Sequence, residues 1–313
     1  MKVLMIHGTG QEDTTSDKLL KKWTESLHKA SPGLLSSSDT QMAYYGKPLA
    51  DWIKSKKGKK AVGIWGLKSV GIDIDYEDEE EFLTEVFQEA AYDQGVTEAE
   101  IIQAAVKANH LVGGGHTEAL VKANHLIGGG HVVPVDNFIA RRLVGLVKIV
   151  GKLSPAKGET LFYLSRQARA YLSSPETAKV VDDIVRPLLQ ASPQVLITHS
   201  LGSVVAFKLL REMHMQGTSI EIPLLITMGS PLGLNAFKKR LGPPPPLLKP
   251  SFVKEWRNFY DPSDFVALGK PLGKVFADGI IDDGKVNNTT LNAHGIIGYL
   301  PHKGVIDALK KVL

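Results

Sequence analysis

The chain has 313 residues, of which 43% are hydrophobic and 22% charged, which is ordinary for a soluble globular protein and supplies ample material for a core. It contains no cysteine, which excludes disulfides and thiol chemistry. The formal net charge is +4 and the basic residues are scattered, so we expect no nucleic-acid partner and interpret the basic residues 54–60 as a solvated loop.

The N-terminal residues are too few and too strand-like for a signal peptide. No apolar run approaches the ~20 residues of a membrane span. With the missing cysteines, these features lead us to expect a cytoplasmic protein without a transmembrane segment.

The first part of the chain alternates apolar runs with one helical segment. Helical periodicity covers Asp17–Lys29. The strands expected here are Lys2–Ile6, which runs into His7-Gly8-Thr9-Gly10, then Gln41–Tyr45 and Ala61–Trp65.

From about residue 70 to about residue 180 the pattern changes. An acidic run from Asp73 to Glu81 leads into helical segments. We therefore expect a single α/β domain over residues 1–313, with a helical cap or lid inserted at about 70–180.

The insertion contains a tandem repeat. Residues 106–116 recur at 121–131 with ten of eleven positions identical, a period of 15 residues. Two copies are too few for a solenoid, so we predict a duplicated helix whose copies each end at a glycine triplet. A metal site is the alternative, but triglycine spacers make a poor rigid frame. We favour helix-end histidines and expect no metal; the histidines concerned are His110, His116, His125 and His131.

Strands and helices alternate again in the last part of the chain. A β-branched run beginning at Val195 is followed at once by a helical segment. Pro223–Met228 and Trp256–Tyr260 are further expected strands, and Val305–Val312 is a closing helix. This alternation predicts a mostly parallel sheet with helices on both faces.

A serine lies at the junction between strand and helix. Ser200 at the apex of a strand–turn–helix unit has the context of a nucleophile elbow, in which the N–H of Leu201 can point at a developing oxyanion. Such a turn needs small residues two places to either side. Gly202 meets this requirement, whereas Thr198 departs from the usual Gly-x-Ser-x-Gly. The alternative is a serine that caps a buried helix.

A nucleophilic serine needs a base and a carboxylate that orients the base, here in the chain order Ser, Asp or Glu, His. Two aspartates follow the strand at 256–260. Asp261 precedes Pro262 and is interpreted as a turn former, so Asp264 is the favoured acid and Asp261 its alternative. The other acids considered are Asp278, Asp282 and Asp283.

The base is predicted to be His294, which lies in a polar loop and is followed by a glycine. His302 stands in what we interpret as a solvated turn. His214 and His28 lie on helical segments and are expected to be exposed.

The loop His7-Gly8-Thr9-Gly10 can supply the second N–H donor that acyl transfer requires, from Thr9, because glycines let the backbone approach a substrate. A phosphate nest or a plain turn is the alternative. A dinucleotide site is not expected, because a third glycine and the acidic residue after the next strand are missing.

Five motifs together carry a family resemblance. They are the loop 7–10, the elbow 199–206, the Gly-Ser-Pro-Leu-Gly at 229–233, the stretch 258–267 and His294-Gly295. The chain resembles serine hydrolases of the α/β-hydrolase fold in the esterase/lipase superfamily, more narrowly bacterial intracellular-type hydrolases, over residues 1–66 and 160–313. The resemblance implies that Ser200 is the nucleophile, Asp264 the acid and His294 the base, with Thr9 and Leu201 forming the oxyanion hole.

We therefore expect a hydrolase that cleaves a small, hydrophobic carboxylic ester through an acyl-enzyme, without a cofactor. An acyltransferase, a thioesterase or an amidase would use the same three residues. A non-catalytic α/β scaffold that binds a lipid or a partner through the insertion is an alternative of another class, as is a metal-dependent protein that uses the repeat histidines.

Overall fold

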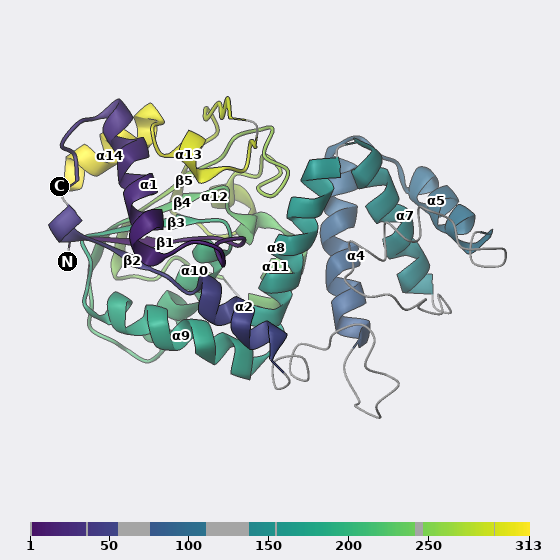
Figure 1. Cartoon of the computed structure of the whole chain (residues 1–313), viewed down its shortest axis with the longest axis horizontal. Coiled ribbons are helices and arrows are strands. Elements are labelled where there is room, and N and C mark those ends of the chain that lie inside the picture. The colour runs from purple at the N-terminus through teal and green to yellow at the C-terminus, as the bar shows by residue number, and fades with distance from the viewer. Residues whose placement is uncertain are drawn as a thin grey trace. The chain divides into compact units, whose positions relative to one another are not determined.

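The computed structural model describes residues 2–35, 37–55, 76–110, 138–153, 155–241, 247–290 and 292–313. The chain divides into two compact units (Figure 1). One unit is formed by Met1–Trp52 with Ala178–Leu313, and the other by Ile53–Thr177. The strand expected at 61–65 and all but the first residues of the tandem repeat lie outside the described residues.

The first unit contains a sheet whose six described strands are all parallel, in the order β2-β1-β3-β4-β5-β6. The expected α/β class is therefore confirmed. The strands are β1 (Val3–Ile6), β2 (Thr40–Ala43), β3 (Val195–His199), β4 (Ile222–Met228), β5 (Val253–Phe259) and β6 (Ile280–Asp283). The edge strand β6 was not predicted, and it carries two of the candidate acids, Asp282 and Asp283.

Helices cover both faces of this sheet, as parallel sheets require, because their strands are buried on both sides. In Figure 1, α1 and α14 lie over one face and α9 and α10 over the other. Two of the helices, α2 and α9, extend past the boundary between the units. The helices and 3-10 turns of the unit are α1 (Ser16–Ala30), η1 (Ser37–Asp39), α2 (Gly46–Lys54), α9 (Pro175–Gln190), α10 (Leu201–Met215), η3 (Pro231–Gly233), α11 (Asn235–Leu241), α12 (Leu272–Val275), α13 (Ile296–Tyr299) and α14 (Lys303–Val312).

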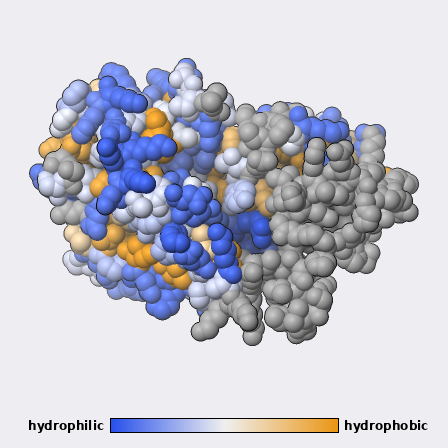
Figure 2. All heavy atoms as spheres, in the orientation of Figure 1, coloured by the Kyte–Doolittle hydropathy of each residue, from blue (hydrophilic) through white to orange (hydrophobic). Residues whose placement is uncertain are grey.

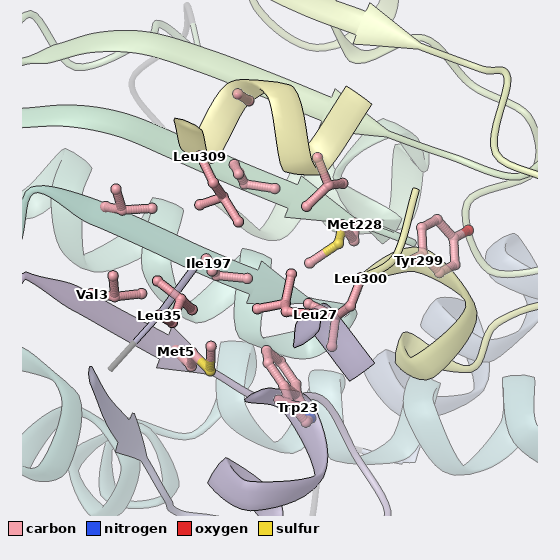
Figure 3. Packing of buried hydrophobic residues seen from close by; sticks show 14 of the residues in the cluster. Val3, Met5, Trp23, Leu27, Leu35, Ile197, Met228, Tyr299, Leu300 and Leu309 are labelled. Atoms are coloured by element: carbon pink, nitrogen blue, oxygen red, sulfur yellow. The ribbon is translucent and has the colours of Figure 1, made fainter. Parts of the chain in front are cut away.

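The core on the α1 side is formed by alternate strand residues (Figure 3). Val3 and Met5 of β1 face the same way, and Trp23 of α1 packs onto them. The opposite side of α1 is polar, and it forms a hydrophilic band on the surface in Figure 2. This amphipathic pattern explains why the periodicity at 17–29 predicted the helix correctly.

The strand order brings several loops together at the carboxyl ends of the strands. The chain passes from β1 to β2 on one side, and from β3 to β4 on the other, so the order reverses between β1 and β3. In open parallel sheets, ligands bind outside the carboxyl ends of the strands at such a switch point. The loops that begin at His7 and Ser200 both start there.

The second unit is helical in its described part, as predicted for this segment. Its helices are α4 (Tyr76–Asp93), α5 (Glu98–His110), α7 (Phe138–Leu153) and α8 (Pro155–Ser173). Arg142 of α7 pairs with Glu98 of α5 at 2.6 Å. Its function as a cap or lid stays a prediction. Among the described helices of both units, none is long and apolar enough to cross a membrane.

Candidate active site

Ser200 lies at the turn between β3 and α10 in a strained backbone conformation, with φ 53° and ψ −128°. Positive φ in a residue other than glycine costs of order 1–3 kcal/mol and is found mainly at functional sites. The turn is held by the Ser200 N–H, which donates to the Met228 carbonyl at 3.1 Å. The side chain of Ser200 makes no capping hydrogen bond to the helix, so the geometry does not support the helix-cap interpretation.

The residues two places from Ser200 explain how tightly the elbow packs. A methyl group on Gly202 would lie 2.3 Å from the carbonyl oxygen of Ile6, so α10 lies almost against the end of β1. Thr198 is fully buried, and its hydroxyl donates to the Ile226 carbonyl at 2.9 Å. This hydrogen bond to β4 accommodates a threonine where glycine is usual.

Three of the predicted site residues are brought together in a hydrogen-bonded chain. Nε2 of His294 lies 2.9 Å from Oγ of Ser200, and Nδ1 lies 2.9 Å from Oδ2 of Asp264. A carboxylate can only accept, so Nδ1 carries the proton and Nε2 accepts the Ser200 hydroxyl. All three side chains are buried. The arrangement can remove the serine proton and stabilise the imidazolium that results.

The Asp264 carboxylate is held by further donors. Oδ1 accepts the Val266 N–H at 2.8 Å, and Oδ2 accepts the Tyr299 hydroxyl at 2.6 Å. Burial alone would raise the pKa of Asp264, but His294, the Tyr299 hydroxyl and the Val266 N–H together lower it below its ordinary value. Asp264 therefore stays ionised beside the histidine.

Asp261, the alternative acid, has a different environment. Its Oδ1 accepts from the N–H and the hydroxyl of Ser263, at 2.7 and 2.6 Å, and its Oδ2 accepts the Asn288 N–H at 2.6 Å. These bonds close a turn and join it to the Asn288 loop. No hydrogen bond between Asp261 and His294 is found in the described part of the chain, so Asp261 is a turn former here.

The other candidates are not part of the Ser200 hydrogen-bond chain. Asp282 accepts the N–H groups of Leu272 and Gly273 at the start of α12. Asp283 pairs with His302 at 3.2 Å, and Asp278 is exposed. His214 bonds Ser251 at 3.3 Å and His28 lies 2.9 Å from the Leu35 carbonyl.

Two residues of the site were not singled out from the sequence, Tyr299 and His199. Nε2 of His199 donates to the backbone carbonyl of His294 at 2.8 Å, and the two rings lie 4.7 Å apart. Burial and the adjacent His294 lower the pKa of His199 to about 3, so its ring is neutral. Its position next to Ser200 was a usable signal, whereas nothing in the sequence pattern marked Tyr299.

His7 holds the loop that lies against Ser200. Its Nδ1 donates to the Gly8 carbonyl at 2.7 Å, and its Nε2 accepts the Tyr45 N–H at 3.0 Å. Burial lowers the pKa of His7 to about 4, so its ring is neutral and carries its one proton on Nδ1. In a trans peptide the carbonyl and the next N–H point in opposite directions, so the Thr9 N–H points away from the His7 ring.

The same loop is in contact with the serine. A methyl group on Gly8 would lie 2.6 Å from Cβ of Ser200 and 3.1 Å from its Oγ. Neither the Thr9 N–H nor the Leu201 N–H donates to an acceptor within the described ranges. An oxyanion hole requires N–H donors that are free to bind the oxyanion, and these two N–H groups are free in the described part of the chain.

No group of three or more His, Asp or Glu side chains that could hold a metal ion is found in the part of the chain that the structure describes. His116, His125 and His131 lie outside it, as does the side chain of His110.

No protein-family model matches the chain, and neither does any curated protein sequence or solved structure. The function proposed below therefore depends on the geometry of the site.

Proposed function

We propose that the protein is a serine hydrolase of the α/β-hydrolase fold, which cleaves carboxylic esters through an acyl-enzyme. The observation that carries the proposal is the hydrogen-bonded chain from Ser200 through His294 to Asp264, with Ser200 strained at the turn. A helix-capping or merely buried serine has no need of a histidine at 2.9 Å with an ionised carboxylate behind it.

Acylation begins when Oγ of Ser200 attacks the ester carbonyl carbon. His294 accepts the hydroxyl proton at Nε2 as the O–C bond forms, and Asp264 stabilises the imidazolium. His294 then gives this proton to the alcohol oxygen as the ester C–O bond breaks. The alcohol leaves, and the acyl group stays on Ser200.

The carbonyl oxygen becomes an oxyanion in this step, and the N–H groups of Thr9 and Leu201 are its proposed donors. Each donor in such a hole contributes about 10²–10³ to kcat in comparable enzymes. Because the Gly8 carbonyl is tied to His7, the Thr9 N–H needs no reorganisation when the charge develops.

Deacylation repeats the sequence with water. His294 takes a proton from the water as its oxygen attacks the acyl carbon, and returns the proton to Oγ of Ser200 as the acid leaves. The chemistry uses only these side chains and two backbone donors, so the proposal includes no cofactor.

The strand order supports the fold assignment. The nucleophile follows the strand next to the switch point, the acid follows β5, and the base comes after β6, in the order Ser, Asp, His. A hydrophobic small-molecule ester as substrate and a cytoplasmic location are parts of the proposal that depend on the sequence alone.

The test is hydrolysis of a p-nitrophenyl ester series by wild type and Ser200→Ala, with a fluorophosphonate probe applied to both. We expect wild type to hydrolyse the esters and to take up one probe molecule, which intact-mass and peptide mapping would locate at Ser200. Both signals should vanish in Ser200→Ala. Ser26→Ala is the matched control, because Ser26 is buried on α1 and bonds the Ile297 carbonyl at 2.9 Å.

Labelling at another serine, or turnover retained in a clean preparation of Ser200→Ala, would refute the proposal. A folded wild type that neither labels nor hydrolyses any ester of the series would do the same.

A further inference from the structure

Tyr299, at the end of α13, is the one side-chain hydroxyl among the described residues that shares the Asp264 carboxylate with His294. Its oxygen lies 2.6 Å from Oδ2 of Asp264 and 3.1 Å from the backbone nitrogen of Asp261. The Asp261 N–H can only donate, so the Tyr299 oxygen accepts there and its own proton is directed at Asp264.

The tyrosine ring is fixed by packing. Tyr299 is fully buried and belongs to the hydrophobic cluster under α1 and α14. Figure 3 shows its ring beside Leu300, with the hydroxyl oxygen pointing away from the labelled core side chains. The hydroxyl cannot leave Asp264 unless this core is repacked.

Oδ2 of Asp264 accepts from two donors, the Tyr299 hydroxyl and Nδ1 of His294, the latter at 2.9 Å. A hydrogen bond to an ionised oxygen takes up part of its charge. The charge that Asp264 offers to a protonated His294 is therefore smaller with the tyrosine bond than without it.

We propose that Tyr299 is a positioning residue that fixes Asp264 and moderates its pull on His294, so that the base releases its proton at a lower pH than it would beside an unshared carboxylate. The proposal rests on the proposed function in so far as His294 is the base of the reaction.

The other groups around His294 do not replace Asp264 as its charged partner. From β3, His199 faces its ring and is neutral, since burial and His294 lower the pKa of His199 to about 3. From the acid loop, Phe265 faces it without charge, its ring centroid 6.1 Å away. Asp261, the next carboxylate, is engaged by Ser263 and Asn288.

The first test is the pH profile of kcat/KM for Tyr299→Phe against wild type. We expect the acidic limb to move up by about half to one pH unit, since an opposite charge that gains strength favours the protonated histidine. Tyr171→Phe is the control, because Tyr171 is fully buried in the second unit. A folded Tyr299→Phe whose limb coincides with that of wild type overturns the proposal.

A second variant serves if Tyr299→Phe does not fold. Replacement of Tyr299 alone by 3-fluorotyrosine keeps the ring and makes the hydroxyl a stronger donor. The acidic limb should then move down. A limb that stays in place or moves up refutes the assignment.

A measurement without turnover separates this inference from the proposed function. The ring of His294 can be followed by NMR with ¹³C-labelled histidine, its signal identified by its loss in His294→Gln. We expect the ring to titrate at higher pH in Tyr299→Phe than in wild type, and identical titrations would overturn the proposal. A protein without hydrolysis or probe labelling would refute the function, while this titration would still decide the role of Tyr299.

Discussion

The backbone carbonyl of His294 accepts a hydrogen bond from Nε2 of His199 at 2.8 Å. The residue before Ser200 thus holds the loop that carries His294, across 95 positions of sequence. Because the His199 ring also lies 4.7 Å from that of His294, both the main chain and the side chain of His294 are supported from β3.

Replacement of His199 by leucine should displace His294, because the donor to its carbonyl is lost. A shift of about 1 Å in a catalytic group costs roughly 10²-fold in rate, so we expect kcat/KM to fall by about that factor. His199→Gln is the matched variant, since its amide can still donate to the carbonyl. It should keep more activity than His199→Leu. Equal losses in the two variants would contradict the role of this hydrogen bond.

The two aspartates after β5 should respond differently to loss of charge. Asp264→Asn should lower kcat by up to about 10⁴-fold with the fold preserved, because the carboxylate no longer holds the tautomer or stabilises the imidazolium. Asp261→Asn should instead cost about 1–3 kcal/mol of unfolding free energy, because Oδ1 and Oδ2 accept from Ser263 and Asn288 and the substitution turns one of these two oxygens into an NH2 donor.

Ester hydrolysis and urea unfolding of both variants would check this. If Asp261→Asn were the more damaging change for activity, the acid would be misassigned.

Gly8→Ala should reduce activity more than stability. The added methyl would lie 2.6 Å from Cβ of Ser200, so either the serine or the Thr9 loop must move. Since both groups act on the same carbonyl, we expect a loss of about 10²-fold or more in kcat. Gly151→Ala in α7 is the control, because no atom of the described residues lies within 4 Å of its added methyl.

In the control, alanine should stabilise the helix by roughly 0.5–1 kcal/mol and leave activity unchanged. Kinetics and thermal unfolding of both variants are the measurements. A Gly8→Ala protein with wild-type kcat would show that the loop is not part of the site.

Stability should fall in acid because two histidines are buried in the neutral form. The pKa of His7 is lowered by burial from 6.5 to about 4, and that of His199 by burial and His294 to about 3. As pH falls below 6.5, these two histidines become protonated in the unfolded chain before they do so in the folded protein. The unfolding free energy therefore decreases until pH has passed the pKa that each histidine has in the folded protein. For His7 the full effect is of order 3 kcal/mol.

His7→Asn isolates this contribution, because its amide can still donate to the Gly8 carbonyl but does not titrate. Urea unfolding of both proteins between pH 7 and pH 4 should show the advantage of wild type shrinking as pH falls. A difference that stays constant over this range would disprove the burial of a neutral His7.

The local sequence was sufficient to predict a structural feature where all the residues that determine it lie in one short stretch. The β-branched run at Val195, the turn at Ser200 and the glycine at 202 form the elbow within eight residues, so its geometry was predictable. The apolar periodicity of α1 and the alternation of strands and helices likewise predicted the parallel sheet. The strand β6 was missed because it has only four residues, two of them aspartates, at the edge of the sheet.

The order Ser, Asp, His and the favoured residues Ser200, Asp264 and His294 could be predicted from the sequence, but the local pattern left Asp261 open as an alternative acid. Asp261 and Asp264 lie three residues apart after the same strand, and only the path of the loop turns one toward His294 and the other toward Asn288. Tyr299 bonds Asp264 across 35 positions, and His199 bonds His294 across 95. These contacts depend on the register of parallel strands and on core packing, which are properties of the whole chain, and no local pattern encodes them.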